Sequence, residues 1–127
     1  MKYLLDAHTL IWWHESPDLL SEKVLALCED VNNQLFLSMV SIWEMQIKLQ
    51  LKKLTLTTPL ADMVTLQQNN GISILPVSID HIVGLDTIPL HHKGPFDRLL
   101  IAQTTVENAI LLSKDTKFQL YPVKTAW

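Results

Sequence analysis

Short apolar runs alternate with helical patterns along this chain, and this alternation limits the folds open to it. Residues that favour strands occupy 3–5, 34–38, 72–77 and 109–113. Segments with helical periodicity separate these runs. Apolar strands joined through helices are typical of a parallel sheet that is covered on both faces. We therefore predict a three-layer α/β/α fold with a mostly parallel central sheet of four to five short strands.

The segments between the runs predict the covering helices. Pro122 is tolerated only in an edge strand, so residues 121–124 are predicted to add a fifth strand at the edge. The 127 residues, 48% of them hydrophobic, are enough for a core, and we expect a single domain over residues 1–127. Helices are expected over residues 8–14, 20–31, 40–51, 60–68, 78–85 and 97–107.

Charge and cysteine content narrow the class of protein. The net charge of −3 does not supply the basic field that is usual for nucleic-acid binding, so such binding would need local cations or a bound metal. No stretch approaches the roughly 20 apolar residues that span a bilayer. Cys28 is the only cysteine, which excludes an internal disulfide and fits a cytoplasmic location.

Four acidic residues occupy related positions around the predicted strands. Asp6 follows the first strand, Glu44 begins the helix after the second, and Asp115 follows the fourth. Asp97 begins the helix that precedes the fourth strand, and a helix antiparallel to the strands begins at their carboxyl ends. Ligands bind at that edge of an open parallel sheet. We therefore expect the four side chains to share one end of the molecule.

Each acid also has a purely structural interpretation. Asp6 and Asp115 fit N-caps, and Asp97 fits a first-turn anion that complements the helix dipole. The spacing of Ser41 and Glu44 matches a capping box. Four carboxylates at one end would nevertheless repel one another unless a cation lay between them. Carboxylate oxygens suit Mg²⁺, with Mn²⁺ as a substitute.

Four segments together carry a resemblance to a known family. They are LLDAHTL at residues 4–10, SMVSIWE at 38–44, GPFDRLLIAQ at 94–103 and LSKD at 112–115. With these motifs the chain resembles the PIN-domain ribonucleases, in particular the VapC-like toxins of type II toxin–antitoxin modules.

The resemblance implies a function and a site. It implies a PIN fold and a Mg²⁺-dependent endoribonuclease that hydrolyses RNA phosphodiester bonds with metal-activated water. It places the catalytic, metal-binding acids at Asp6, Glu44, Asp97 and Asp115, with Glu44 acting directly or through a water. It also implies a cognate antitoxin and a homodimer as partners.

Cationic and aromatic residues near the acids offer further contacts. Lys93, Arg98, Lys114 and Lys117 adjoin the acids in sequence and are candidate RNA contacts. The alternatives are solvated surface charge for the lysines and pairing with an acid for Arg98. The adjacent residues Trp12 and Trp13 are predicted to contribute to the core or to a partner surface. The adjacent residues His91 and His92 are predicted to contact solvent or RNA rather than zinc.

Two rival functions remain open from the sequence. A phosphoaspartate-type phosphatase would place a second aspartate two residues after Asp6, where this chain has His8, and it would not explain Glu44. The other rival is a non-catalytic interaction module with the PIN fold, against which the complete set of acids argues.

Overall fold

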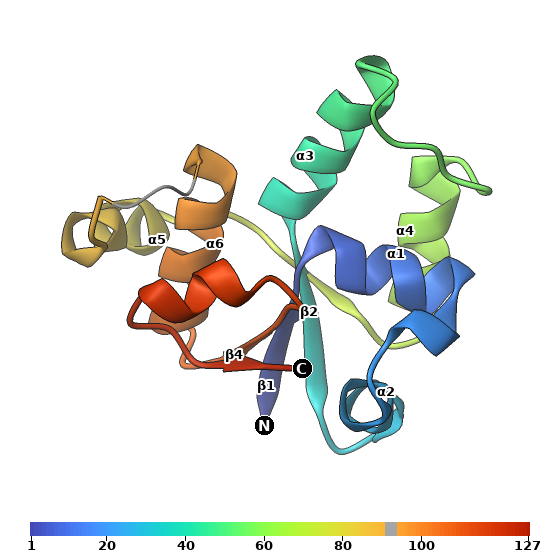
Figure 1. The fold of residues 1–127 in the computed structure, drawn as a ribbon, viewed down its shortest axis with the longest axis horizontal. Helices are drawn as coiled ribbons and strands as arrows, with labels where there is room; N and C mark the ends of the chain where they lie inside the picture. The colour runs from blue at the N-terminus through green and yellow to red at the C-terminus, as the bar shows by residue number, and fades with distance from the viewer. Residues whose placement is uncertain (91–93) are drawn as a thin grey trace.

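The computed structural model describes residues 1–90 and 94–127, and Figure 1 shows its fold. The predicted order of strands and helices is confirmed. The strands are β1 (Lys2–Leu5), β2 (Gln34–Ser38), β3 (Ser73–Leu75), β4 (Ile110–Leu112) and β5 (Thr125–Ala126). The helices are α1 (Ala7–Glu15), α2 (Glu22–Glu29), α3 (Met39–Gln50), α4 (Leu60–Asn69), α5 (Ile79–Val83) and α6 (Pro95–Val106). Short 3₁₀ helices are η1 (Pro17–Leu19), η2 (Gly84–Thr87) and η3 (Thr116–Leu120).

The five strands form one sheet in the order β3-β2-β1-β4-β5, and every neighbouring pair is parallel. Leu5 lies opposite Leu37 of β2 and Leu112 of β4, so the three central strands end at nearly the same level. The chain moves outward from β1 through β2 to β3 and then crosses to β4 on the other side of β1. The predicted mostly parallel sheet is confirmed.

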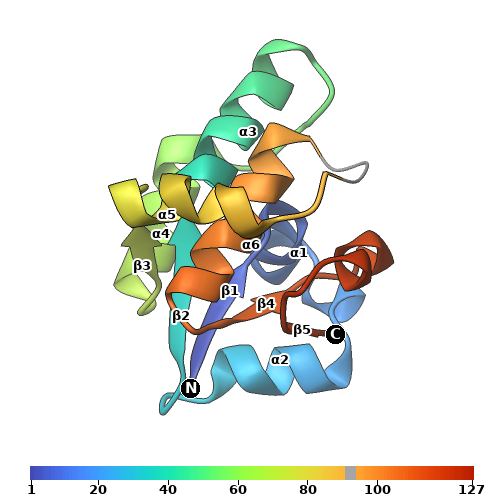
Figure 2. The same cartoon turned by 90° about the vertical axis from the view of Figure 1, so that its left-hand side faces the viewer.

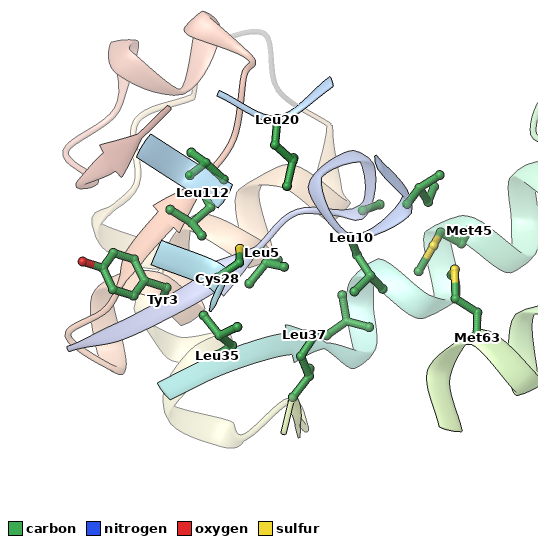
Figure 3. Packing of buried hydrophobic residues seen from close by; sticks show 14 residues of the cluster. Tyr3, Leu5, Leu10, Leu20, Cys28, Leu35, Leu37, Met45, Met63 and Leu112 are labelled. Atoms are coloured by element: carbon green, nitrogen blue, oxygen red, sulfur yellow. The ribbon is translucent and has the colours of Figure 1, made fainter. Parts of the chain in front are cut away.

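Helices cover both faces of this sheet. Figure 1 shows α1, α2 and α4 on one side of the strands and α5 and α6 on the other. Alternate residues of each strand face opposite layers: Leu5 and Leu37 belong to the first cluster, whereas Leu4 and Leu111 pack with α6 in the second. Figure 3 shows the first cluster extending from Tyr3 at the sheet to Met63 of α4. The predicted three-layer arrangement follows from this alternation.

The end of the chain differs from the prediction. The fifth strand lies at Thr125–Ala126, not at residues 121–124. A 3₁₀ helix that the sequence analysis did not predict, η3, takes up the residues after Asp115, and the Tyr121 N–H donates to its Phe118 carbonyl. The chain is therefore still turning at Pro122, and it reaches β4 where the Lys124 carbonyl accepts from the Leu111 N–H, with Thr125 opposite Leu111.

The carboxyl ends of the strands and the start of α6 lie at the same end of the molecule. Figure 2 shows β1 rising from the N-terminus toward α1, with α6 beginning further up, beside α3. Within the described ranges, no helix is long and apolar enough to cross a membrane.

Candidate functional site

The site lies where the order of the strands changes direction. The chain leaves β1 toward β2, but β4 is the neighbour of β1 on its other side. Connections from β1 and β4 therefore diverge, which leaves a crevice at the carboxyl ends of these two strands. Asp6 follows β1 directly, and Asp115 follows β4 after two intervening residues.

Asp6 is fixed by the start of α1. It is the N-cap of this helix, and its Oδ1 accepts hydrogen bonds from the Thr9 N–H at 2.9 Å and from the Thr9 hydroxyl at 2.7 Å. The Thr9 hydroxyl is buried and also lies 2.9 Å from the Leu112 carbonyl oxygen of β4. Both hydrogen bonds that Asp6 receives from described residues go to Oδ1. This arrangement holds the carboxylate at the junction of β1 and β4 and leaves Oδ2 for another ligand.

Glu44 comes from the second turn of α3. This helix begins at Met39, with the Ser38 hydroxyl accepting from the Val40 N–H. Ser41 therefore lies inside the helix, and its capping box with Glu44 does not form. Glu44 instead lies 3.8 Å from the Lys48 ammonium group, one turn further along α3.

Asp97 and Asp115 complete the set of acids. Asp97 is the acidic residue in the first turn of α6, where the helix dipole favours a negative charge. Asp115 is the N-cap of η3, and its Oδ1 accepts from the Lys117 N–H at 2.9 Å. The structural roles anticipated for Asp6, Asp97 and Asp115 are thus present, and the cap hydrogen bonds orient the carboxylates of Asp6 and Asp115.

The four predicted acids meet at one cavity. A cavity of about 150 Å³ is lined by Asp6, Glu44, Asp97 and Asp115, together with Lys48 and His8. Over residues 1–90 and 94–127, no three acidic, histidine or cysteine side chains lie close enough together to form a metal-binding group. Mg²⁺ usually retains several waters and binds through one or two carboxylates. The four carboxylates of this lining are therefore compatible with a cation that keeps part of its hydration shell, not with a fully enclosed one.

The electrostatics of Glu44 reflect the crowding. Burial raises the pKa of the Glu44 carboxyl, and the neighbouring charges of Asp97 and Asp6 raise this pKa further. The Lys48 ammonium and His8 act in the opposite direction and lower it. The negative charge of Glu44 is therefore unfavourable unless a cation compensates it. The Lys48 ammonium is one such cation.

The candidate RNA contacts differ in their exposure and in their hydrogen bonds. Lys114 and Lys117 are exposed beside Asp115, and Lys93 lies outside the described residues, as does the pair at 91–92. Arg98 donates to the carbonyl oxygens of Pro89 at 2.5 Å and Ile88 at 3.3 Å. Its guanidinium thus holds the backbone at residues 88–89.

Three residues of the site were not among the predicted site residues. Thr9 and Lys48 were not predicted as parts of the site, although an (i, i+3) cap and an (i, i+4) ion pair are patterns that a sequence can show. Trp12 was expected to supply core or partner surface. It is half-buried against the first cluster, and it also lines a second cavity beside Asp6.

Comparisons with known proteins agree with this architecture. The family model described as PIN domain matches residues 3–124. No curated protein sequence matches the chain significantly.

Three solved structures share the fold at low sequence identity. VapBC2 from Rickettsia felis, bound to a DNA fragment from its promoter, aligns with a TM-score of 0.76 and 18% identity over 99% of this chain and 98% of that chain. VapBC-1 from nontypeable Haemophilus influenzae gives a TM-score of 0.68 and 18% identity over 99% and 97%. DNA-bound VapBC from Salmonella typhimurium gives a TM-score of 0.68 and 10% identity over the same shares, 99% and 97%.

Proposed function

The chain belongs to the PIN-domain family, and on this premise we propose that it is a Mg²⁺-dependent endoribonuclease and the VapC-like toxin of a toxin–antitoxin pair. One observation carries the proposal. Carboxylates from four separate segments, Asp6, Glu44, Asp97 and Asp115, line the same cavity at the change in strand order. The N-cap roles of Asp6 and Asp115 and the first-turn position of Asp97 do not by themselves require the four acids to line one cavity.

Asp6, Asp97 and Asp115 would hold Mg²⁺ or Mn²⁺, with Glu44 binding directly or through a water. When bound, the ion supplies positive charge for the phosphate oxygens and lowers the pKa of a coordinated water. Thr9 keeps the Asp6 carboxylate in place, and Asp97 lies in the first turn of α6, where the helix dipole favours its negative charge. Lys48 offsets part of the negative charge beside Glu44.

RNA needs local positive charge to approach this end of the molecule. The acids repel phosphate, and the chain as a whole carries a net charge of −3. Lys114 lines the second cavity, beside Asp6 and Asp115, and Lys117 is an exposed residue of η3. Together with Lys93 and Arg98, these residues are the proposed contacts to flanking phosphates.

The proposed partners are a cognate antitoxin and a second copy of this chain, in the cytoplasm. An antitoxin with a basic side chain would complement the acidic cavity and block it. The homodimer is supported by exposed apolar side chains on α3 and α5, among them Trp43 (60% exposed) and Ile79 (80% exposed). Sedimentation at micromolar concentration should therefore give a dimer, and a monomer would refute this part of the proposal.

Cleavage of RNA by the purified chain tests the function. Asp97→Asn and Asp115→Asn should each reduce Mg²⁺-dependent cleavage by roughly 100-fold or more, the scale on which one electrostatic contact acts in a catalytic site. Asp18→Asn changes an exposed acid of η1 and serves as the matched control. Chelation should abolish cleavage, and Mn²⁺ should restore it. Wild-type rates from a folded Asp97→Asn variant would refute the proposal.

A further inference from the structure

A second cavity adjoins the acidic one and has a different chemical character. It measures about 480 Å³ and is lined by Trp12, His8, Lys114 and Thr116, with Asp6 and Asp115 at its border to the acids. Asp6, His8 and Asp115 also line the acidic cavity, so the two spaces share a wall. Its volume lies within the range of small-molecule sites.

Trp12 forms an aromatic wall that its neighbours hold in position. Its ring packs edge-on against Trp127, with centroids 5.8 Å apart, and its side chain also packs against the first hydrophobic cluster. The His8 ring, one turn earlier in α1, lies 5.6 Å from Trp12 at an interplanar angle of 46°. The Lys114 ammonium lies 5.8 Å from the Trp12 ring centroid. The Trp12 indole is therefore held in position at this cavity, with the His8 ring and the Lys114 ammonium beside it.

We propose that this cavity is a nucleobase-binding subsite, in which Trp12 stacks on one base of single-stranded RNA next to the phosphate that is cleaved. This inference rests on the proposed function and names a determinant of its substrate. Every base offers a face for stacking on an aromatic side chain, and such stacking contributes about 1–3 kcal/mol per base. His8 offers a second ring to the base, and Lys114 moves from the indole to an adjacent phosphate.

The fold couples this subsite to the acids. Asp6 caps α1, and His8 and Trp12 lie on the same helix. Lys114 directly precedes Asp115 after β4. A base held by Trp12 therefore has a fixed relation to two of the four carboxylates. Lys114 offers its charge to a phosphate, which leaves the space beside the Trp12 and His8 rings for a base.

Binding by a variant that does not cleave tests the subsite separately from catalysis. In an Asp97→Asn background with Mg²⁺, a labelled single-stranded RNA should bind roughly 5- to 150-fold more weakly after Trp12→Ala. Trp12→Phe should retain most of the affinity because it keeps an aromatic face. Trp13→Ala removes the same side chain from the next position, which lines a different cavity, and should leave binding unchanged. Circular dichroism checks that each variant is folded.

Abasic RNA identifies the contact itself. A series of RNAs, each lacking one base, should contain one member for which Trp12→Ala causes no further loss of affinity, because the stacked base is already absent. The proposal is overturned if Trp12→Ala leaves binding unchanged or weakens every abasic RNA as much as the intact one. Failure of the unsubstituted chain to cleave RNA would refute the proposed function but would not change this binding result.

Discussion

Thr9→Val tests whether a buried hydroxyl positions the first carboxylate of the site. Thr9 is 0% exposed, and its Oγ1 lies 2.7 Å from Asp6 Oδ1 and 2.9 Å from the Leu112 carbonyl oxygen. Valine has nearly the same shape, but it cannot donate to either acceptor. The backbone N–H of residue 9 still caps Asp6, so α1 keeps its first turn. The hydroxyl has a single proton to share between these two acceptors, so the substitution removes the equivalent of one hydrogen bond and changes the shape of the side chain little.

The expected cost follows from the charge of the acceptor. A hydrogen bond to a charged group contributes about 1.5–3 kcal/mol, so the free energy of unfolding should fall by about 2 kcal/mol. For a chain of this size each kcal/mol shifts Tm by roughly 3–5 °C, which gives a decrease of about 6–10 °C. A less restrained Asp6 should also raise the Mg²⁺ concentration needed for activity by about 10- to 100-fold.

Two measurements separate these effects. Thermal unfolding in the presence of a chelator reports the stability, and titration of RNA cleavage with Mg²⁺ reports the effect on the site. Thr9→Ser retains the hydroxyl and should stay close to the wild type in its Mg²⁺ requirement. The expected decrease in Tm is several degrees. If Tm of Thr9→Val instead lies within about 1 °C of the wild-type value, this hydroxyl does not hold Asp6.

Three further predictions concern the core and the ionisable groups. Leu111→Ala deletes a side chain that is 0% exposed and should lower the free energy of unfolding in urea by about 2–5 kcal/mol, whereas Leu111→Met should cost less than about 1.5 kcal/mol. Glu44→Gln should raise Tm of the metal-free protein at neutral pH, because the raised pKa of Glu44 means that its negative charge opposes folding there; a lower Tm would contradict this reasoning. Burial raises the pKa of the Cys28 thiol to about 12, so the unfolded chain loses this proton first and stability should decline as the pH rises above about 8.5. Cys28→Ala should reduce that decline, and an unchanged pH profile of Tm would refute the assignment.

Local sequence patterns determined the order of elements and the choice of acids. The apolar runs at β1 and β2 and the proline that begins α6 act through burial and backbone geometry, which depend on nearby residues. For the same reason the cap at Asp6 and the first-turn position of Asp97 could be predicted. The order of short apolar strands and helices also determined that the sheet would be parallel and covered on both faces, and the position of each acid relative to its strand predicted the end of the molecule at which it would lie.

Only the tertiary structure decided which side chains share a space. Asp6 lines the same cavity as Asp97, and Trp12 contacts Lys114, because β4 pairs with β1. These two strands are far apart in the sequence, and no local pattern predicts how close the side chains come. Backbone acceptors decided the role of Arg98, because the carbonyl oxygens of the loop before α6 bind its guanidinium. The late start of β5 has a similar cause, since it depends on where η3 returns the chain to the sheet edge. Sequence thus determined the chemical groups available to the site, and packing of distant segments decided which of them act together.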